Sequence, residues 1–170
     1  LTLKNIYPIA ILIFFLSFPL FTHSQEQSRG IAIKGTSQSG DITIDGNYWA
    51  LIIGINEYPN LPPAMQLQAA RADAQEVATV LQKRYGFAKE RMIQLYDKKA
   101  SRDEIIMALE SLGGAVGEKD SLLIYYAGHG EFNKINKRGF WIPSDAVKDK
   151  QSTFVSNADI KDYLESIKAK

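Results

Sequence analysis

Apolar positions along residues 48–167 fall into two kinds of segment that alternate with each other. Residues 49–55 and 121–127 are nearly continuous apolar runs, and residues 92–96 form a third, shorter one. Runs of this kind are typical of strands that are buried on both faces of a parallel sheet. Residues 65–85 and 101–114 instead carry apolar side chains at helical spacing, so each predicts a helix between two strands.

Start and stop signals support these boundaries. Gly86 ends the first predicted helix, and the pair Gly113 and Gly114 ends the second. Ser101 with Glu104 three residues later forms a capping box, which marks the start of that second helix. Beyond the third strand, residues 140–143 predict a short strand, and a last helix is expected from Ser156 or Asn157 through Ile167.

Strands that alternate with helices indicate βαβ units with right-handed crossovers. The expected fold class is therefore α/β, a three-layer sandwich with a mostly parallel sheet and helices on both faces. Three parallel strands are few for this architecture, and the next buried strand would be due after Lys170. We therefore expect the sheet to be incomplete at its C-terminal side.

The N-terminal residues have a different pattern. Lys4 precedes an apolar run over residues 9–21, and small residues follow at Thr22 and Ser24, which is typical of a secretory signal peptide over residues 1–24. The run is short for a bilayer-spanning helix and contains Pro19, so we expect no stable membrane span after cleavage; an uncleaved anchor is the alternative. Residues 25–47 are expected to be a polar linker or a weak hairpin, and residues 48–170 a single domain. The protein is then exported, to the periplasm, the cell surface or the medium.

Charge and composition exclude several classes of function. The chain has 20 Lys and Arg against 19 Asp and Glu, so it offers no overall charge for nucleic acid or an anionic membrane. It contains no Cys, which excludes disulfides, zinc–thiolate sites and a cysteine nucleophile within these 170 residues. Phosphate-binding glycine motifs are absent and one His lies outside the predicted signal peptide, so we expect no cofactor and no metal.

The most informative polar segment follows the third strand. Ligands of open α/β sheets bind at the carboxyl ends of the strands, and the sequence there reads Gly128-His129-Gly130. A histidine between two glycines has an unhindered ring and a main chain that a substrate can approach closely. Taken alone, a single histidine of this kind is more often a loop residue that is simply solvated at the strand end.

These residues resemble the caspase-like cysteine peptidases, in the bacterial metacaspase-like branch of peptidase family C14. Residues 125–130, Tyr-Tyr-Ala-Gly-His-Gly, resemble the histidine strand of that family, and residues 49–58 resemble its first strand. Similar stretches follow in order at residues 67–74, 95–102 and 140–146, so the resemblance covers about residues 49–170. It implies the caspase-like fold and a protein or peptide substrate.

The resemblance also implies a mechanism. A Cys–His dyad cleaves the peptide bond, with His129 assisting thiolate attack and protonating the leaving amine. The N–H of Gly130 matches the oxyanion-hole donor. The cysteine lies about 50 residues beyond the histidine in caspases, whereas this chain ends 41 residues beyond His129. We therefore expect a fragment, inactive by itself, of a longer cysteine endopeptidase; the first residue, Leu1, also points to a fragment.

Asp73 is the candidate for substrate binding. The resemblance places an Asp of the first helix in the primary specificity pocket, which implies cleavage after Arg or Lys. The motif here reads Arg71-Ala72-Asp73-Ala74, where the family often has Asn before the Asp. The plain alternative is a first-turn Asp that complements the helix dipole.

Further polar residues are weaker candidates. Glu57 and Asp97 are expected at the same sheet edge and in reach of substrate, Asp145 is expected to shape the loop after the histidine, and Glu131 lies close to His129 in sequence. The basic residues Lys134, Lys137 and Arg138 predict an exposed loop.

Two other functions compete with a peptidase. A non-catalytic caspase-like module that binds proteins would lack the cysteine in the longer protein as well. A flavodoxin-like domain for a small phosphorylated ligand is the third hypothesis, although no phosphate-binding glycine loop is present.

Overall fold

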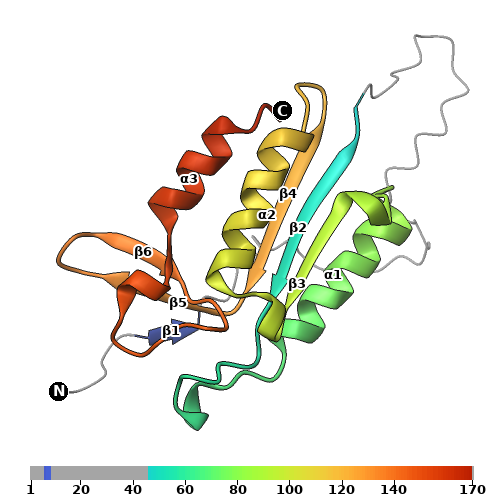
Figure 1. The fold of residues 1–170 in the computed structure, drawn as a ribbon. Helices are drawn as coiled ribbons and strands as arrows, with labels where there is room; N and C mark the ends of the chain where they lie inside the picture. The colour runs from blue at the N-terminus through green and yellow to red at the C-terminus, as the bar shows by residue number, and fades with distance from the viewer. Residues whose placement is uncertain (1–5, 9–45, 170) are drawn as a thin grey trace, which may run out of the picture.

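The fold is built on a three-stranded parallel sheet (Figure 1), seen in a computed structural model that describes residues 6–8 and 46–169. Strand β2 (Tyr48–Gly54) is central, with β3 (Met92–Tyr96) on one side and β4 (Ser121–Ala127) on the other. In register, Ile52 of β2 lies opposite Gln94 of β3 and Tyr125 of β4. The three predicted parallel strands are confirmed, and their carboxyl ends lie at the same edge of the sheet.

Helices cover both faces of this sheet. Ala50 and Ile52 of β2 pack in one apolar cluster with α1 (Ala70–Arg84). Leu51 and Ile53 point the other way, into a larger cluster shared with α2 (Arg102–Ala115) and α3 (Asn157–Ser166). Successive side chains of a strand point to opposite faces, which explains why one apolar run supplies both clusters. The expected three-layer α/β fold is confirmed.

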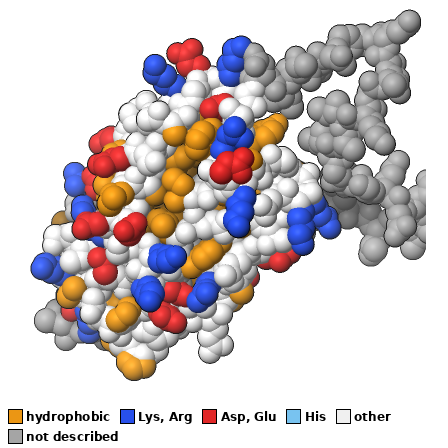
Figure 2. All heavy atoms as spheres, turned by 45° about the vertical axis from the view of Figure 1, so that its right-hand side comes forward, with side chains coloured by type: hydrophobic (Ala, Val, Ile, Leu, Met, Phe, Trp, Pro, Cys, Tyr) orange, Lys and Arg blue, Asp and Glu red, His pale blue; other side chains and the backbone are white. Residues whose placement is uncertain are grey.

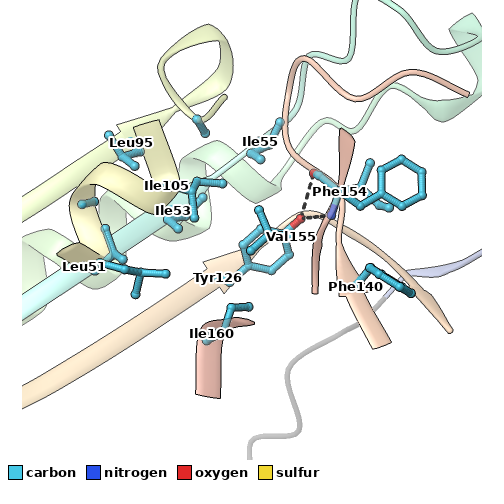
Figure 3. Packing of buried hydrophobic residues seen from close by; sticks show 14 of the residues in the cluster. Leu51, Ile53, Ile55, Leu95, Ile105, Tyr126, Phe140, Phe154, Val155 and Ile160 are labelled. Carbon is cyan, nitrogen blue, oxygen red and sulfur yellow. Dashed lines mark hydrogen bonds between the residues drawn. The ribbon is translucent and has the colours of Figure 1, made fainter. Parts of the chain in front are cut away.

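The larger cluster is the main core of the molecule. Figure 3 shows side chains from β2, α2 and α3 converging with Tyr126 of β4, with Phe140 and Val155 of the second sheet, and with Phe154 just before β7. Each buried Leu, Ile, Val or Phe side chain stabilises the fold by about 1.5–3 kcal/mol relative to its exposed state. The second sheet is therefore fastened to the first through a shared core.

That second sheet is antiparallel. Its strands are β1 (Ile6–Pro8), β5 (His129–Asn133), β6 (Arg138–Trp141) and β7 (Val155–Ser156), in the order β1-β5-β6-β7. The alternative of a loop position for His129 was wrong, because residues 129–133 form a strand. The hairpin is closed by the Asn133 side chain, whose Oδ1 accepts hydrogen bonds from the N–H groups of Ile135 and Asn136.

Two helix boundaries also differ from expectation. Helix α1 begins at Ala70 rather than near residue 65, because the Gln66 side chain binds the main chain of Tyr58 and holds this segment as a loop. Helix α2 continues through Gly113 and Gly114 to Ala115.

The predicted caps are present at the other helix starts. Ser101 Oγ accepts a hydrogen bond from the N–H of Glu104, and Ser156 Oγ accepts one from the N–H of Asp159. Within residues 46–169, four short 3-10 helices lie in the connections, at Pro63–Met65, Lys89–Arg91, Asp97–Lys99 and Gln151–Thr153.

The predicted signal peptide over residues 1–24 and the predicted linker over residues 25–47 lie outside the described residues, apart from 6–8 and 46–47. Strand β1, within the first of these regions, pairs antiparallel with β5, with Tyr7 opposite Gly130 and Pro8 opposite His129. None of the helices in the described part of the chain is both long and apolar enough to cross a bilayer.

Candidate active site

His129 lies where the two sheets meet. Strand β4 ends at Ala127, and after Gly128 the chain enters β5 with His129 as its first residue. The His129 side chain is only 7% exposed. The expected position at the carboxyl edge of the parallel sheet is therefore correct, but the residue begins a strand and is not in a solvated loop.

The two ring nitrogens of His129 have different surroundings. Nε2 lies 2.6 Å from the carbonyl oxygen of Met65. A carbonyl oxygen can only accept, so Nε2 carries the proton of the neutral ring. Nδ1 is buried and lacks a hydrogen-bond partner. Among the described residues, it is the one buried side-chain nitrogen or oxygen atom without such a partner. Its lone pair is available to a group that is not part of the described structure.

The Met65 carbonyl is held by a loop that closes on itself. Gln66 bonds the main chain of Tyr58 twice, accepting from its N–H at 2.8 Å and donating to its carbonyl at 3.0 Å. The N–H of Leu67 donates to the carbonyl of Asn56, and the Asn56 side chain accepts from the N–H of Arg71 at the start of α1. This loop, residues 56–71, ties the end of β2 to α1 and fixes the acceptor for Nε2.

Two buried tyrosines lie against His129. The ring of Tyr58 is 4.9 Å from the imidazole, and its hydroxyl accepts the N–H of His129 at 2.9 Å. The Tyr126 hydroxyl donates to the carbonyl of His129 at 2.7 Å. Burial raises the pKa of Tyr58 to about 12 and that of Tyr126 well above its ordinary value, so both are neutral phenols near pH 7.

Gly130 is buried and second in β5. It lies opposite Trp141 of β6 on one side and opposite Tyr7 of β1 on the other. The His129 carbonyl bonds to Ile142 on the β6 side, so the N–H of Gly130 points to the β1 side. The role expected for this N–H therefore requires β1 to leave the edge of β5.

Asp73 lies in the first turn of α1, on the face of the sheet that this helix covers, and is exposed. The pKa of Tyr125 on β4 is raised by burial and further by the charge of Asp73. Asp73 is therefore near the end of β4, at the same edge as His129. Its exposure leaves the carboxylate accessible to a ligand.

Asp97, expected to be in reach of substrate, is instead part of the scaffold. Its side chain is 7% exposed and pairs with Arg71 at 2.9 Å, while Oδ1 accepts from the N–H groups of Asn56 and Glu57. The residue has a φ of 47°, which is unusual outside glycine and which these contacts hold in place. Glu57 itself is exposed.

The remaining candidates have partners elsewhere. Asp145 accepts the N–H of Arg102 and so caps α2. Glu131 accepts from the side chain of Gln151. The basic residues Lys134, Lys137 and Arg138 are exposed at the β5–β6 turn, as predicted.

Sequence reasoning missed three residues that contact His129, one through its main-chain carbonyl and two through side-chain hydroxyls. Met65 contributes its main-chain carbonyl, and the identity of its side chain gives no indication of this role. Tyr58 and Tyr126 fall within the segments that resemble the family, yet nothing in their spacing predicts that both hydroxyls converge on His129. That convergence depends on β2 and β4 being neighbours in the sheet.

Charges of both signs are mixed over the face shown in Figure 2, where a band of hydrophobic side chains lies between them.

The part of the chain that the structure describes contains no group of three or more His, Cys, Asp or Glu placed to hold a metal ion.

Comparison with known proteins places the chain in a family. The sequence matches the caspase domain family, peptidase C14, over residues 47–170. Metacaspase-1 of Schizosaccharomyces pombe is 30% identical over 120 residues, which cover 67% of this chain and 28% of that protein. Metacaspase-1B of Aspergillus oryzae is 34% identical over 91 residues, which cover 50% of this chain and 21% of that protein. The chain thus spans less than a third of the length of these relatives.

The fold has a counterpart among solved structures. Protein GSU0716 from Geobacter sulfurreducens superposes with a TM-score of 0.57 at 22% identity, over 73% of this chain and 47% of that one. The likeness is one of fold. Together with the match over residues 47–170, it leads to one conclusion: the chain belongs to the caspase domain family.

Proposed function

We propose that this chain supplies the histidine half of a Cys–His endopeptidase. The observation that carries the proposal is Nδ1 of His129, which is buried, deprotonated in the neutral ring and without a partner. Leaving a buried polar atom unpaired costs about 1–3 kcal/mol. A thiol that donates a hydrogen bond to Nδ1 would remove that cost, and Nδ1 would then be placed to act as the base for this thiol.

The geometry around His129 suits both proton transfers. Nδ1 accepts the thiol proton as the sulfur attacks the scissile carbonyl carbon, and the resulting imidazolium gives that proton to the leaving amine as the C–N bond breaks. Water then hydrolyses the acyl-enzyme and restores the thiol. The Met65 carbonyl, 2.6 Å from Nε2, orients the ring throughout and stabilises its positive charge.

Gly130 is proposed to stabilise the oxyanion. Its N–H belongs to the residue directly after His129, on a strand that pairs with β6, and Phe140 of β6 packs in the main core. A donor fixed before the reaction stabilises the developing charge without reorganising, and one such donor is worth about 10²–10³-fold in kcat.

We place the nucleophile on a further strand beside β4, in the longer protein of which this chain would be a part. Strand β4 is at the sheet edge among the described strands, and most of its apolar residues are only half-buried. Next to it is a groove of about 260 Å³ lined by Leu122, Ile124, Leu164, Ile167 and Ala169. A parallel strand paired with β4 would cover these side chains and end at the same edge as His129.

Cleavage after Arg or Lys is the proposed specificity. The exposed carboxylate of Asp73 lies near the end of β4, where it would attract a cationic side chain and repel an acidic one. The proposed substrate is a protein or peptide. We further propose that residues 1–24 direct export and are removed, which would also remove β1 from the edge of β5.

The test is cleavage of fluorogenic peptides that end in Arg, Lys or Asp, by the protein extended beyond Lys170. We expect cleavage after Arg and Lys, and a loss of about 10²–10⁴-fold in kcat for His129→Ala. Asp73→Asn should raise KM for the Arg peptide, whereas Asp103→Asn, which changes an exposed acid in the first turn of α2, should not. An equal effect of both would leave only the helix-dipole explanation for Asp73.

A non-catalytic binding module is the competing function, in which the longer protein lacks the cysteine as well; the 170 residues end before the position at which the cysteine is expected, so they do not separate the two functions. The alternative would be established if the extended protein has no cysteine on the strand after α3 and cleaves none of the three peptides. That result would overturn the proposed peptidase function.

A further inference from the structure

The peptide groups of His129 are held by two phenols from different strands. Tyr58, four residues beyond the end of β2, accepts the His129 N–H at 2.9 Å. Tyr126, near the end of β4, donates to the His129 carbonyl at 2.7 Å and lies 3.0 Å from the carbonyl of Ile142. Figure 3 shows Tyr126 inside the main core, so its hydroxyl reaches the histidine from a rigid position.

Gly128 allows both hydroxyls to come this close. A Cβ at this position would lie 2.7 Å from the Tyr126 hydroxyl and 2.8 Å from that of Tyr58. Since real Cβ atoms do not approach oxygens so closely, any other residue would push the phenols apart. The first glycine of the Gly-His-Gly segment therefore makes room for the two tyrosines.

Tyr58 also belongs to the loop that supplies the Met65 carbonyl. The two hydrogen bonds between Gln66 and the main chain of Tyr58 link them directly. His129 is thus fixed at its N–H by Tyr58, at Nε2 by Met65 and at its carbonyl by Tyr126. The first two contacts come from one loop, so they move together.

We infer that Tyr58 is a positioning residue whose hydroxyl sets the direction of the His129 imidazole, and with it the direction of the Nδ1 lone pair. The inference rests on the proposed role of His129 as the base. A phenylalanine would fill the same fully buried site, and burying a hydroxyl without a hydrogen bond is unfavourable. The Tyr58 hydroxyl is hydrogen-bonded to the His129 N–H and to the Tyr126 hydroxyl, and Tyr126 in turn bonds to the His129 carbonyl, so both contacts serve the main chain of His129.

The first experiment uses this chain and needs no activity. In ¹⁵N-labelled protein, amide exchange and the ring ¹⁵N shifts of His129 are compared between the parent, Tyr58→Phe and Tyr163→Phe. The control removes a phenol that donates to Glu110 at 3.1 Å, between α3 and α2. His23→Gln, made in every sample, leaves His129 as the one histidine signal.

In Tyr58→Phe we expect His129 amide exchange to accelerate about tenfold relative to amides of β2, because one hydrogen bond is lost. The ring ¹⁵N shifts should move from those of a pure Nε2–H ring toward a mixture of both tautomers. Tyr163→Phe should leave both readouts at parent values. A role in stability alone would accelerate β2 and His129 equally with no tautomer change, and that result would overturn the inference.

The second experiment uses the extended protein. Tyr58→Phe should lower kcat by about 10–100-fold with KM unchanged, since a small misplacement of the base impairs the chemical step alone. Unchanged kcat would overturn the positioning role. An inactive parent whose NMR readouts respond as expected would refute the proposed function and leave the positioning of His129 by Tyr58 intact.

Discussion

Asp120 shows how one side chain joins two strands at the end of the sheet opposite His129. Its carboxylate accepts hydrogen bonds from the N–H groups of Gly117 at 3.0 Å and Asn47 at 2.6 Å, and from Trp49 Nε1 at 3.0 Å. The Gly117 and Asn47 contacts lower the pKa of Asp120 from 3.8 to about 2, although burial opposes them. The start of β2 is thereby fastened to the start of β4.

Because folding lowers this pKa, the charged carboxylate stabilises the folded state above pH 4, and the contribution disappears as the pH falls from about 4 to about 2. Asp120→Asn should therefore lower the urea midpoint at pH 7, and the difference from the parent should shrink over that acid range. The difference in urea midpoint is measured by urea denaturation at a series of pH values, with unfolding monitored by circular dichroism.

The matched control is Asp149→Asn, which changes an exposed aspartate. It should leave the midpoint close to that of the parent at every pH. A pH-independent loss in Asp120→Asn, or an equal loss in the control, would contradict the assignment.

At this scale the sequence predicted the position of His129. The helix predicted from residue 65 would have put Asp73 well inside it, whereas the residue lies in the first turn of α1. The sequence did not predict that Asp97 is buried in an ion pair with Arg71, because both residues follow separate strands and their contact depends on the strand order. The Met65 carbonyl could not be predicted either, since a main-chain acceptor is the same in every residue type.

Close packing of β2 on α1 depends on the last residue of the strand. A Cβ on Gly54 would lie 2.6 Å from the Cβ of Ala74 and 2.8 Å from the carbonyl oxygen of Ala70. Since the opposing atoms include main chain, the helix could relieve the clash only by moving away from the sheet. This contact also sets how closely the first turns of α1, which carry Asp73, pack against the sheet.

Gly54→Ala should therefore destabilise the protein by about 1–3 kcal/mol, as overpacking of a core does. Gly114→Ala is the matched control, because Gly114 lies in α2 and a Cβ there meets nothing within 4 Å. It should stabilise the protein by about 0.5–1 kcal/mol, since alanine favours a helix over glycine. Thermal unfolding gives the melting temperature of each variant relative to the parent. A shift of the same sign in both variants would contradict the packing described.

The parallel strands and the capped helix starts were predictable, because each depends on residues adjacent in sequence. The start of α1 and the strand β5 were not. Residues 66–69 are drawn into the loop by the contact between Gln66 and Tyr58, and β5 exists because β6 returns beside it. Both are tertiary effects that override the local pattern.

The molecule as a whole has a sheet that ends, among the described strands, at β3 on one side and β4 on the other. Strand β4 is apolar and half-buried, and the groove of Leu122, Ile124 and Leu164 lies beside it. Exposed edges of this kind pair with other chains when no native strand covers them. The strand that we propose beside β4 would cover this edge.

This chain by itself should therefore self-associate through β4. Sedimentation velocity should show an average mass that rises with concentration, and Ile124→Lys should reduce the rise. Ile93→Lys, a matched change of a half-buried isoleucine on β3, should reduce it less. Equal effects at the two edges would contradict a special role for β4.

The most direct test of the central claim is to label the nucleophile. The extended protein is treated with a peptidyl-arginine chloromethyl ketone, and the modified residue is identified by mass spectrometry. We predict a single modified cysteine on the strand after α3, with labelling slowed at least tenfold by His129→Ala. No modified cysteine, or labelling that is indifferent to His129, would contradict the assignment of this site as half of a Cys–His dyad.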